Sequence, residues 1–348
     1  MSFWQNLEKP LVGLSPMDGI TDEPMRFITK KYGRADLIFT EFINVEHIPH
    51  KPEKLMERFI FSSLERPIVA QLSGHTPSLF YKAALVAAYL GFDGVDINMG
   101  CPVKSVVSGG GGAALIKNHT LAQEIILAVK KALDDWQKGI SLEKVLTDKE
   151  WFKAVIKARE RNSRISGEKI GSNPILGLSV KTRLGENSRE TREWVTFLSS
   201  LPLEAITLHG RNWRQEHSGK VNWPEIGRMA RIARRAGKIF LGNGGVSSRQ
   251  EANKLARRYH LDGVLIGRAA LGNPWVFTSH RPSRQERLAV MKEHLLYFDR
   301  LFGAQAFVAM RKHFGWYCRD FRDAKRLKQI LFKTNTVNQA LAIINQNQ

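Results

Sequence analysis

Residues 94–102 read Gly-Val-Asp-Ile-Asn-Met-Gly-Cys-Pro, an apolar run that ends in a sharp turn carrying a thiol. The run predicts a buried strand that stops at the turn. Glycine permits positive φ and proline fixes φ, so Gly100 and Pro102 hold Cys101 at a defined place after the strand. A thiol there, next to the glycine-rich residues 109–112, indicates acid or nucleophile chemistry beside a bound phosphate or cofactor. The alternative is a small buried hydrophobe, since unpaired cysteine often has only that role.

The same alternation of short apolar runs and helical stretches recurs along the chain. Besides the run that ends at Cys101, strands are predicted at residues 11–15, 36–40, 67–72, 175–182, 205–208, 239–241 and 263–266. Helices are predicted at residues 22–32, 78–90, 120–136, 191–199, 224–236 and 248–259. Successive βα units with nearly all-apolar strands predict an α/β fold, a (β/α)8 TIM barrel. A doubly wound open sheet is the alternative, but the chain lacks a dinucleotide-binding fingerprint.

Two regions fall outside this alternation. Residues 134–173 are too long for an ordinary loop, so an insertion of one or two helices is predicted there, with an apolar stripe at Trp151, Phe152, Val155 and Ile156. Residues 1–282 form the predicted barrel, and residues 283–348 a small α-helical domain. That domain interleaves aromatic residues with the basic residues Arg311, Lys312, Arg319, Arg322, Lys325, Arg326, Lys328 and Lys333. The mixture suits RNA, but an aromatic core with a charged solvent face would look the same.

The composition favours a polyanionic partner. The chain of 348 residues has 53 Lys and Arg against 33 Asp and Glu, a net charge of +20. Nucleic acid is the first expectation and an anionic membrane surface the second, although a generally basic proteome would leave the same excess. Two distant cysteines do not make a disulfide framework, and the chain shows neither a signal peptide nor a membrane-spanning run. A cytoplasmic protein is therefore expected.

A set of mostly polar residues stands at the ends of the predicted strands, where TIM barrels carry their active sites. They are Pro16, Met17, Gln71, Asn98, Cys101, Lys181, Arg183, His209, Asn243 and Arg268. His209 alone would more often be a core histidine. Lys181 and Arg183 share one side of their strand, and a lysine inside a barrel needs an anion or an electron-rich partner.

The glycine-rich turns after the last two strands, at residues 243–245 and 267–268, are where such barrels commonly bind phosphate. A phosphate site, Lys181 and Cys101 together suggest a flavin mononucleotide (FMN) barrel. In it, Lys181 could stabilise negative charge on the reduced flavin.

The motifs resemble the tRNA-dihydrouridine synthase family, and most closely its bacterial B-type subgroup. Matching stretches run in family order at residues 15–22, 69–72, 97–102, 180–185, 208–211, 242–245, 266–275 and 311–317. The resemblance implies an FMN-binding barrel with a C-terminal tRNA-binding domain. It also implies NADPH, or NADH, as reductant of the flavin. Hydride would pass from FMN N5 to C6 of specific uridines in tRNA and a proton from Cys101 to C5, giving 5,6-dihydrouridine.

The resemblance also implies roles for individual residues. FMN would be bound by Pro16, Met17, Asp18, Gln71, Lys181, His209, Asn243, Gly244, Gly245, Gly267 and Arg268. Asn98 and Arg183 would approach the uridine, and Arg311, Lys312 and His313 the RNA. No metal is expected, and the protein would be a monomer without a stable protein partner.

Three features depart from the family pattern: the long insertion, the glycine-rich loop at residues 109–112, and Gly245 where an acidic residue often follows Asn-Gly. Two other functions compete with the reduction of uridine in tRNA. A flavin dehydrogenase of free pyrimidines, such as dihydroorotate, would share the barrel but leave the +20 charge unexplained. An RNA-binding protein on a decayed barrel would leave the thiol, the lysine and the glycine turns unexplained. The modified uridine and the nicotinamide preference are not readable from the sequence.

Overall fold

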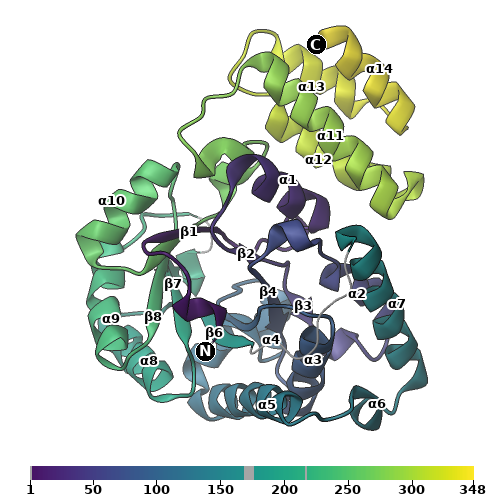
Figure 1. Cartoon of the computed structure of the whole chain (residues 1–348). Helices are drawn as coiled ribbons and strands as arrows, with labels where there is room; N and C mark the ends of the chain where they lie inside the picture. The colour runs from purple at the N-terminus through teal and green to yellow at the C-terminus, as the bar shows by residue number, and fades with distance from the viewer. Residues whose placement is uncertain (1, 168–175, 216–217) are drawn as a thin grey trace.

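The computed structural model describes residues 2–167, 176–215 and 218–348 (Figure 1). Nine strands form one sheet in the order β2-β1-β9-β8-β7-β6-β5-β4-β3, and the pairing of β2 with β4 closes it into a barrel. The eight barrel strands are β1 (Leu11–Leu14), β2 (Ile38–Phe39), β4 (Ile68–Ser73), β5 (Gly94–Met99), β6 (Gly177–Leu184), β7 (Ala205–Asn212), β8 (Ile239–Asn243) and β9 (Gly263–Ile266). All their pairings are parallel, so the predicted TIM barrel is confirmed and the open sheet is excluded.

The barrel is a packed core. Every residue of β1, β4, β5, β8 and β9 is buried, because helices cover the outside while side chains fill the inside. Trp4 is fully buried in a cluster with Leu11, Val69, Leu241 and Leu265 from four strands. The filling of the strands' N-terminal half leaves the C-terminal strand ends as the place for a site.

Helices follow most strands, as the sequence predicts. The barrel helices are α1 (Glu23–Gly33), α3 (Pro77–Tyr89), α5 (His119–Gln137), α8 (Ser188–Ser200), α9 (Trp223–Arg235) and α10 (Arg249–Tyr259). Predicted and observed bounds differ by up to about four residues, most at β7, which extends to Asn212, and next at α8, which begins at Ser188. The start predicted for the strand at residue 175 lies outside the described residues. The short strand β3 (Ile43–Asn44) was not predicted, because two residues carry no recognisable alternation.

The insertion after α5 contains α6 (Leu142–Val145) and α7 (Lys149–Ser166), and residues 168–175 at its end lie outside the described residues. On α7, Trp151 and Val155 are buried, as the apolar stripe predicts. Asn162 accepts a hydrogen bond from the Phe61 amide (3.1 Å) and donates one to the Phe59 carbonyl (3.1 Å). These bonds fix α7 to the loop that follows α2 (Pro52–Met56).

The chain ends in four helices, α11 (Arg284–Phe302), α12 (Phe307–Tyr317), α13 (Ala324–Phe332) and α14 (Val337–Asn347), which gather beside α1 (Figure 1). They share a hydrophobic cluster with Ile28 of α1 and with Trp275. The Tyr297 hydroxyl also donates a hydrogen bond to Glu23 of α1 (2.5 Å). The helical region is thus seated on the barrel through both apolar and polar contacts. Among the described residues, none of the helices combines the length and apolarity that a bilayer crossing requires.

Candidate active site

The strand register brings the predicted site residues together at one end of the barrel. Asn98 of β5 is level with Lys181 of β6, and Arg183 of β6 is level with His209 of β7. His209 is in turn level with Asn243 of β8. Because neighbouring parallel strands lie about 4.8 Å apart, these side chains occupy one continuous arc.

A buried hydrogen-bond network underlies this arc. The Gln71 amide donates to Asp96 (2.7 Å) and accepts from the Asn98 side chain (3.0 Å). Asp96 also accepts from the Ser179 hydroxyl (2.6 Å). Burial raises the pKa of Asp96 to about 6, although these hydrogen bonds and the charge of Lys181 oppose the rise. Asp96 and Ser179 were not predicted as site residues, because each alone looks like an ordinary strand residue.

Cys101 lies at a turn held from both sides. Oδ1 of Asn98 accepts the amides of Gly100 (3.1 Å) and Cys101 (2.9 Å), and Nε of Arg183 donates to the Gly100 carbonyl (2.7 Å). The thiol is half-buried, and burial raises its pKa, with a smaller contribution from Asp18. A thiol whose pKa is above the ordinary value stays protonated at neutral pH, so it can serve as an acid.

Lys181 brings a cation to the centre of the arc. Burial lowers its pKa to about 8, and Arg183 adds repulsion, while Asp96 and Cys101 oppose the shift. Within the described residues, its ammonium group forms neither a hydrogen bond nor an ion pair, although Asp96 and Cys101 act on it electrostatically. An incompletely compensated cation at this depth suits an anionic or electron-rich ligand.

Two arginines and three glycines adjoin the arc on the β7–β9 side. Gly244 and Gly245 have φ of +127° and +69°, and a Cβ on Gly244 would come 3.4 Å from Nε2 of His209. Arg268 follows Gly267 and is exposed, and its charge, after burial, lowers the pKa of Arg211.

Arg211 donates to the Gly219 carbonyl (2.8 Å), and neither arginine forms an ion pair within the described residues. Like charges side by side, with no acidic partner in the part of the chain that the structure describes, fit a phosphate group. Arg211 was missed, although its place directly after the His209-Gly210 strand end was a signal for it.

The β1 end completes the ring. Met17 and Thr21 exchange hydrogen bonds, from the Met17 amide to the hydroxyl (3.0 Å) and from the hydroxyl to the Met17 carbonyl (3.1 Å). A Cβ on Gly267 would come 3.5 Å from the Met17 sulfur, so β9 and β1 meet here. Pro16 is half-buried before Met17, and the exposed Asp18 pairs with Arg58 (2.6 Å).

The residues expected to approach RNA divide between surface and interior. Arg311 and Lys312 of α12 are half-exposed, and Lys312 Nζ donates to the Gly19 carbonyl near the β1 end. His313 is fully buried, with its ring 4.5 Å from that of His294. A direct contact of His313 with RNA is therefore a wrong expectation, because the helix turns this side chain into the interface with α11.

One group of side chains resembles a metal site. Asp22, His294 and His313 are the only three such residues in the described part of the chain whose ligating atoms lie within 4.8 Å of one another. Burial lowers the pKa of His294 to about 3 and that of His313 well below its usual value, and Lys312 lowers both further. We assign no metal here, because the nearby Lys312 cation would repel one.

The comparisons with known proteins identify the family of this chain. The family model for dihydrouridine synthase matches residues 13–142 and 170–348. The chain belongs to this family. A "Probable tRNA-dihydrouridine synthase 2" from Bacillus subtilis is 30% identical over 354 residues, covering 99% of this chain and 96% of that protein. A "Probable tRNA-dihydrouridine synthase" from Staphylococcus epidermidis is 29% identical, covering 99% and 95%.

A solved structure of a dihydroorotate dehydrogenase (DHODH) with ferulenol from Eimeria tenella is also similar, with a TM-score of 0.48 and 14% identity over 82% of each chain. That likeness is too distant to bear on the reaction.

Proposed function

We propose that this protein reduces specific uridines in tRNA to 5,6-dihydrouridine, using FMN. The observation that carries the proposal is the convergence of one protonated thiol, one half-buried lysine and two neighbouring arginines on a single barrel end. This convergence occurs in a chain that belongs to the dihydrouridine synthase family.

The residues present fit FMN. The Gly244–Gly245 turn, Gly267, Arg211 and Arg268 would hold the phosphate, because the glycines allow close approach and the arginines supply charge. Lys181, His209, Gln71, Asn243, Pro16 and Met17 would surround the rest of the cofactor. Asp18, paired with Arg58, would lie at the rim. When bound and reduced, the flavin would supply the hydride for C6 of the base.

Cys101 would donate the proton to C5 of the uridine. Its raised pKa keeps the proton on the sulfur, and Asn98 and Arg183 hold the turn that carries it. General acid catalysis of this kind contributes roughly 10²- to 10⁴-fold. Both polar ends of Asn98 are engaged within the protein, so its main role would be to position Cys101 rather than to bind the base.

tRNA would lie across the barrel end and the C-terminal helices, with residues 1–282 as the catalytic domain and residues 283–348 as the RNA-binding domain. Lys312 lies on the barrel-facing side of that domain, Arg311 donates to Asn335 within it, and Lys325 and Arg326 of α13 are exposed. With a net charge of +20, these cations would supply contacts to the phosphate backbone.

The finer assignments rest on the sequence motifs. The quoted stretches, including Arg311–Tyr317, support the bacterial B-type subgroup. NADPH would be the reductant, the protein would be a monomer, and a tRNA substrate would place it in the cytoplasm.

An anaerobic flavin titration tests the function. Protein loaded with FMN is bleached with NADPH, and then unmodified tRNA, fully modified tRNA or orotate is added. We expect the oxidised flavin spectrum to return only with unmodified tRNA. Return with orotate alone would indicate a dehydrogenase of free pyrimidines. A chain that cannot take up flavin would indicate an RNA-binding protein.

A further inference from the structure

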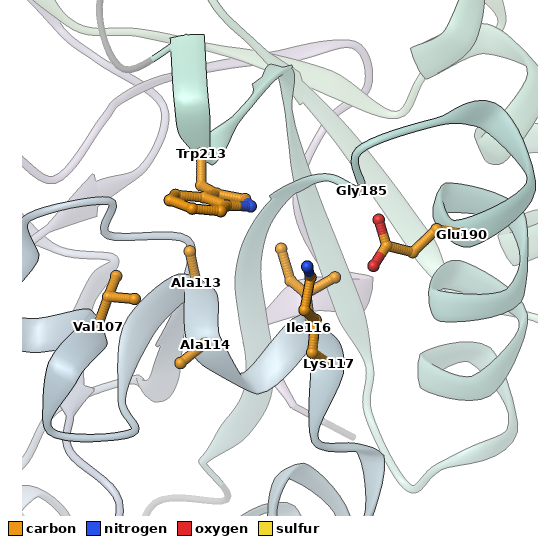
Figure 2. Close-up of a pocket in the computed structure, with 8 residues that line it drawn as sticks. All are labelled: Val107, Ala113, Ala114, Ile116, Lys117, Gly185, Glu190 and Trp213. Atoms are coloured by element: carbon orange, nitrogen blue, oxygen red, sulfur yellow. The ribbon is translucent and has the colours of Figure 1, made fainter.

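A pocket of about 250 Å³ lies beside the arc of site residues and has no role in the function proposed above (Figure 2). The indole of Trp213 lies over it, and Val107, Ala113 and Ile116 form an apolar floor. Lys117 and Glu190 close one end. We call this cavity the Trp213 pocket.

The walls of the Trp213 pocket are continuous with the segments that hold the thiol. The Ala113 amide donates to the Cys101 carbonyl (3.0 Å), so the floor is tied to the cysteine turn. Arg183 donates to the carbonyl of Asn212 (3.4 Å), the residue before Trp213. A ligand that placed one group at Cys101 could therefore place a neighbouring group in the pocket.

The size and lining indicate a flat ligand. Pockets for drug-sized molecules begin at roughly 300 Å³, so about 250 Å³ suits one base or nucleoside. Arg214 stacks over the Trp213 ring (5.1 Å to the centroid) but does not line the pocket. We infer that a base in the pocket would stack on the face of the indole opposite this guanidinium. Aromatic rings are the usual platform for unpaired bases.

The charges at the end of the pocket favour a nucleotide with a particular base. Lys117 (2.6 Å) and Arg214 (3.2 Å) both pair with Glu186, so two cations lie at the rim, where a phosphate backbone would pass. Oε2 of Glu190 accepts the Glu186 amide, and Oε1 has no partner among the described residues. A carboxylate oxygen accepts from the amino groups of cytosine, adenine or guanine and repels the carbonyls of uracil.

We propose that the Trp213 pocket binds the base of a nucleotide that flanks the target uridine in tRNA, and that it prefers a base with an amino group. This rests on the proposed function. Enzymes that act on an extruded base read the nucleotides on either side of it, and contacts to those nucleotides set the sequence context. The pocket would thus help to decide which uridine is reduced.

The test uses unmodified tRNA transcripts that differ only in the nucleotides flanking the reduced uridine. The measured quantity is kcat/KM for dihydrouridine formation per bound flavin. Wild type should prefer an amino-bearing base at one flanking position. Trp213→Ala should lower kcat/KM roughly 5- to 150-fold with the preferred base, and Trp213→Phe should lower it less. Glu190→Gln should shift the preference toward uracil, because its amide can donate to the O4 carbonyl.

Two further variants separate occupation of the pocket from loss of folding. Ala114→Phe fills the pocket without removing the indole and should reproduce the loss of Trp213→Ala, which excludes misfolding as its cause. Leu127→Ala, which removes an exposed apolar side chain on α5, should match wild type. Equal kcat/KM for wild type, Trp213→Ala and Ala114→Phe on every transcript would overturn the proposal.

Failure of the proposed function is distinguishable from failure of the pocket. If wild type makes no dihydrouridine from any transcript, the reaction is wrong. The pocket is then judged by the Kd for tRNA, measured by fluorescence anisotropy. A larger Kd for tRNA in Trp213→Ala and Ala114→Phe would support base binding in the pocket. An unchanged Kd would refute base binding there.

Discussion

Oδ1 of Asn98 accepts the backbone amide of Cys101 at 2.9 Å, and the same oxygen accepts the amide of Gly100. One side chain at the end of β5 thus fixes the turn that carries the thiol. Its Nδ2 donates to Gln71, which is bonded to Asp96. The position of Cys101 is therefore set by the buried network of β4, β5 and β6, as a proton donor requires.

Asn98→Ala should release the cysteine turn. We expect a roughly 100-fold slower formation of dihydrouridine, because a small misplacement of a reacting group can cost that much. Asn98→Asp keeps the acceptor for both amides and should lose less. Bound flavin, read from its absorbance, serves to normalise both rates. A wild-type rate in Asn98→Ala would remove the positioning role.

Cys101→Ala should keep bound flavin but form dihydrouridine roughly 10²- to 10⁴-fold more slowly, since the proton donor is lost. The other cysteine, Cys318, is buried in the helical domain and provides a matched control as Cys318→Ala. Single-turnover reduction of tRNA measures both. Equal rates for Cys101→Ala and wild type would show that another group donates the proton.

Lys181 should make FMN binding depend on pH. Its pKa in the flavin-free chain is about 8, so the ammonium is charged at neutral pH and loses its charge as pH rises through that value. FMN should therefore bind less tightly as the pH rises, and its Kd should increase roughly 10-fold or more between about pH 7 and about pH 9.5. Lys181→Arg stays charged and should show a flatter profile. A flat wild-type profile, measured by flavin fluorescence, would contradict the role.

The exposed cations of α13 should control tRNA affinity. Lys325→Glu with Arg326→Glu should weaken tRNA binding and lower the slope of log K against log salt by up to about 2, one unit for each lost phosphate contact. Lys138→Glu with Lys144→Glu changes net charge equally on the exposed surface of the insertion region and is the control. If both pairs weaken binding equally, overall charge rather than α13 explains the affinity.

His294 should make stability fall in acid. Its folded pKa is about 3 against an ordinary 6.5, so the unfolded chain takes up the proton first, and stability is lost as pH falls below about 6.5. Between about pH 7.5 and about pH 5 this loss is about 2 kcal/mol. His294→Gln should have a lower free energy of unfolding than wild type at pH 7.5. At pH 5 the difference between the two proteins should be smaller by about 2 kcal/mol.

Denaturant unfolding measures both proteins, with the exposed His50→Gln as control. A constant gap between wild type and His294→Gln would show that His294 is not kept neutral by its burial. The comparison with wild type matters because the half-buried Asp22 and the buried Glu23 and Glu65 have raised pKa values, so their contribution to stability changes with pH in the opposite direction.

The part of the site that could be predicted from the sequence is the set of residues at the C-terminal ends of the strands. In a parallel barrel all C-terminal ends meet, so Cys101, Lys181 and His209 could be placed in one site from chain order alone. Asp96 and Ser179 could not, because their roles arise from a cross-strand network between residues far apart in sequence. His313 was misplaced for the same reason, since the burial of its face of α12 depends on how the helices dock.

Because the C-terminal helices pack against the barrel, deleting them would not test RNA binding alone. Deleting residues 283–348 would expose Ile28 and Trp275 and leave Glu23 without the Tyr297 hydroxyl. The barrel would lose packing as well as any RNA contacts, so point substitutions on α13 separate the two effects better.

The central claim is tested most directly by nucleoside mass spectrometry of unmodified tRNA incubated with the protein, FMN and NADPH. The prediction is a gain of two mass units on uridine that requires both NADPH and the protein, and one deuterium at C5 when the solvent is D₂O. Unchanged uridine, with a flavin that NADPH still bleaches, would contradict the account.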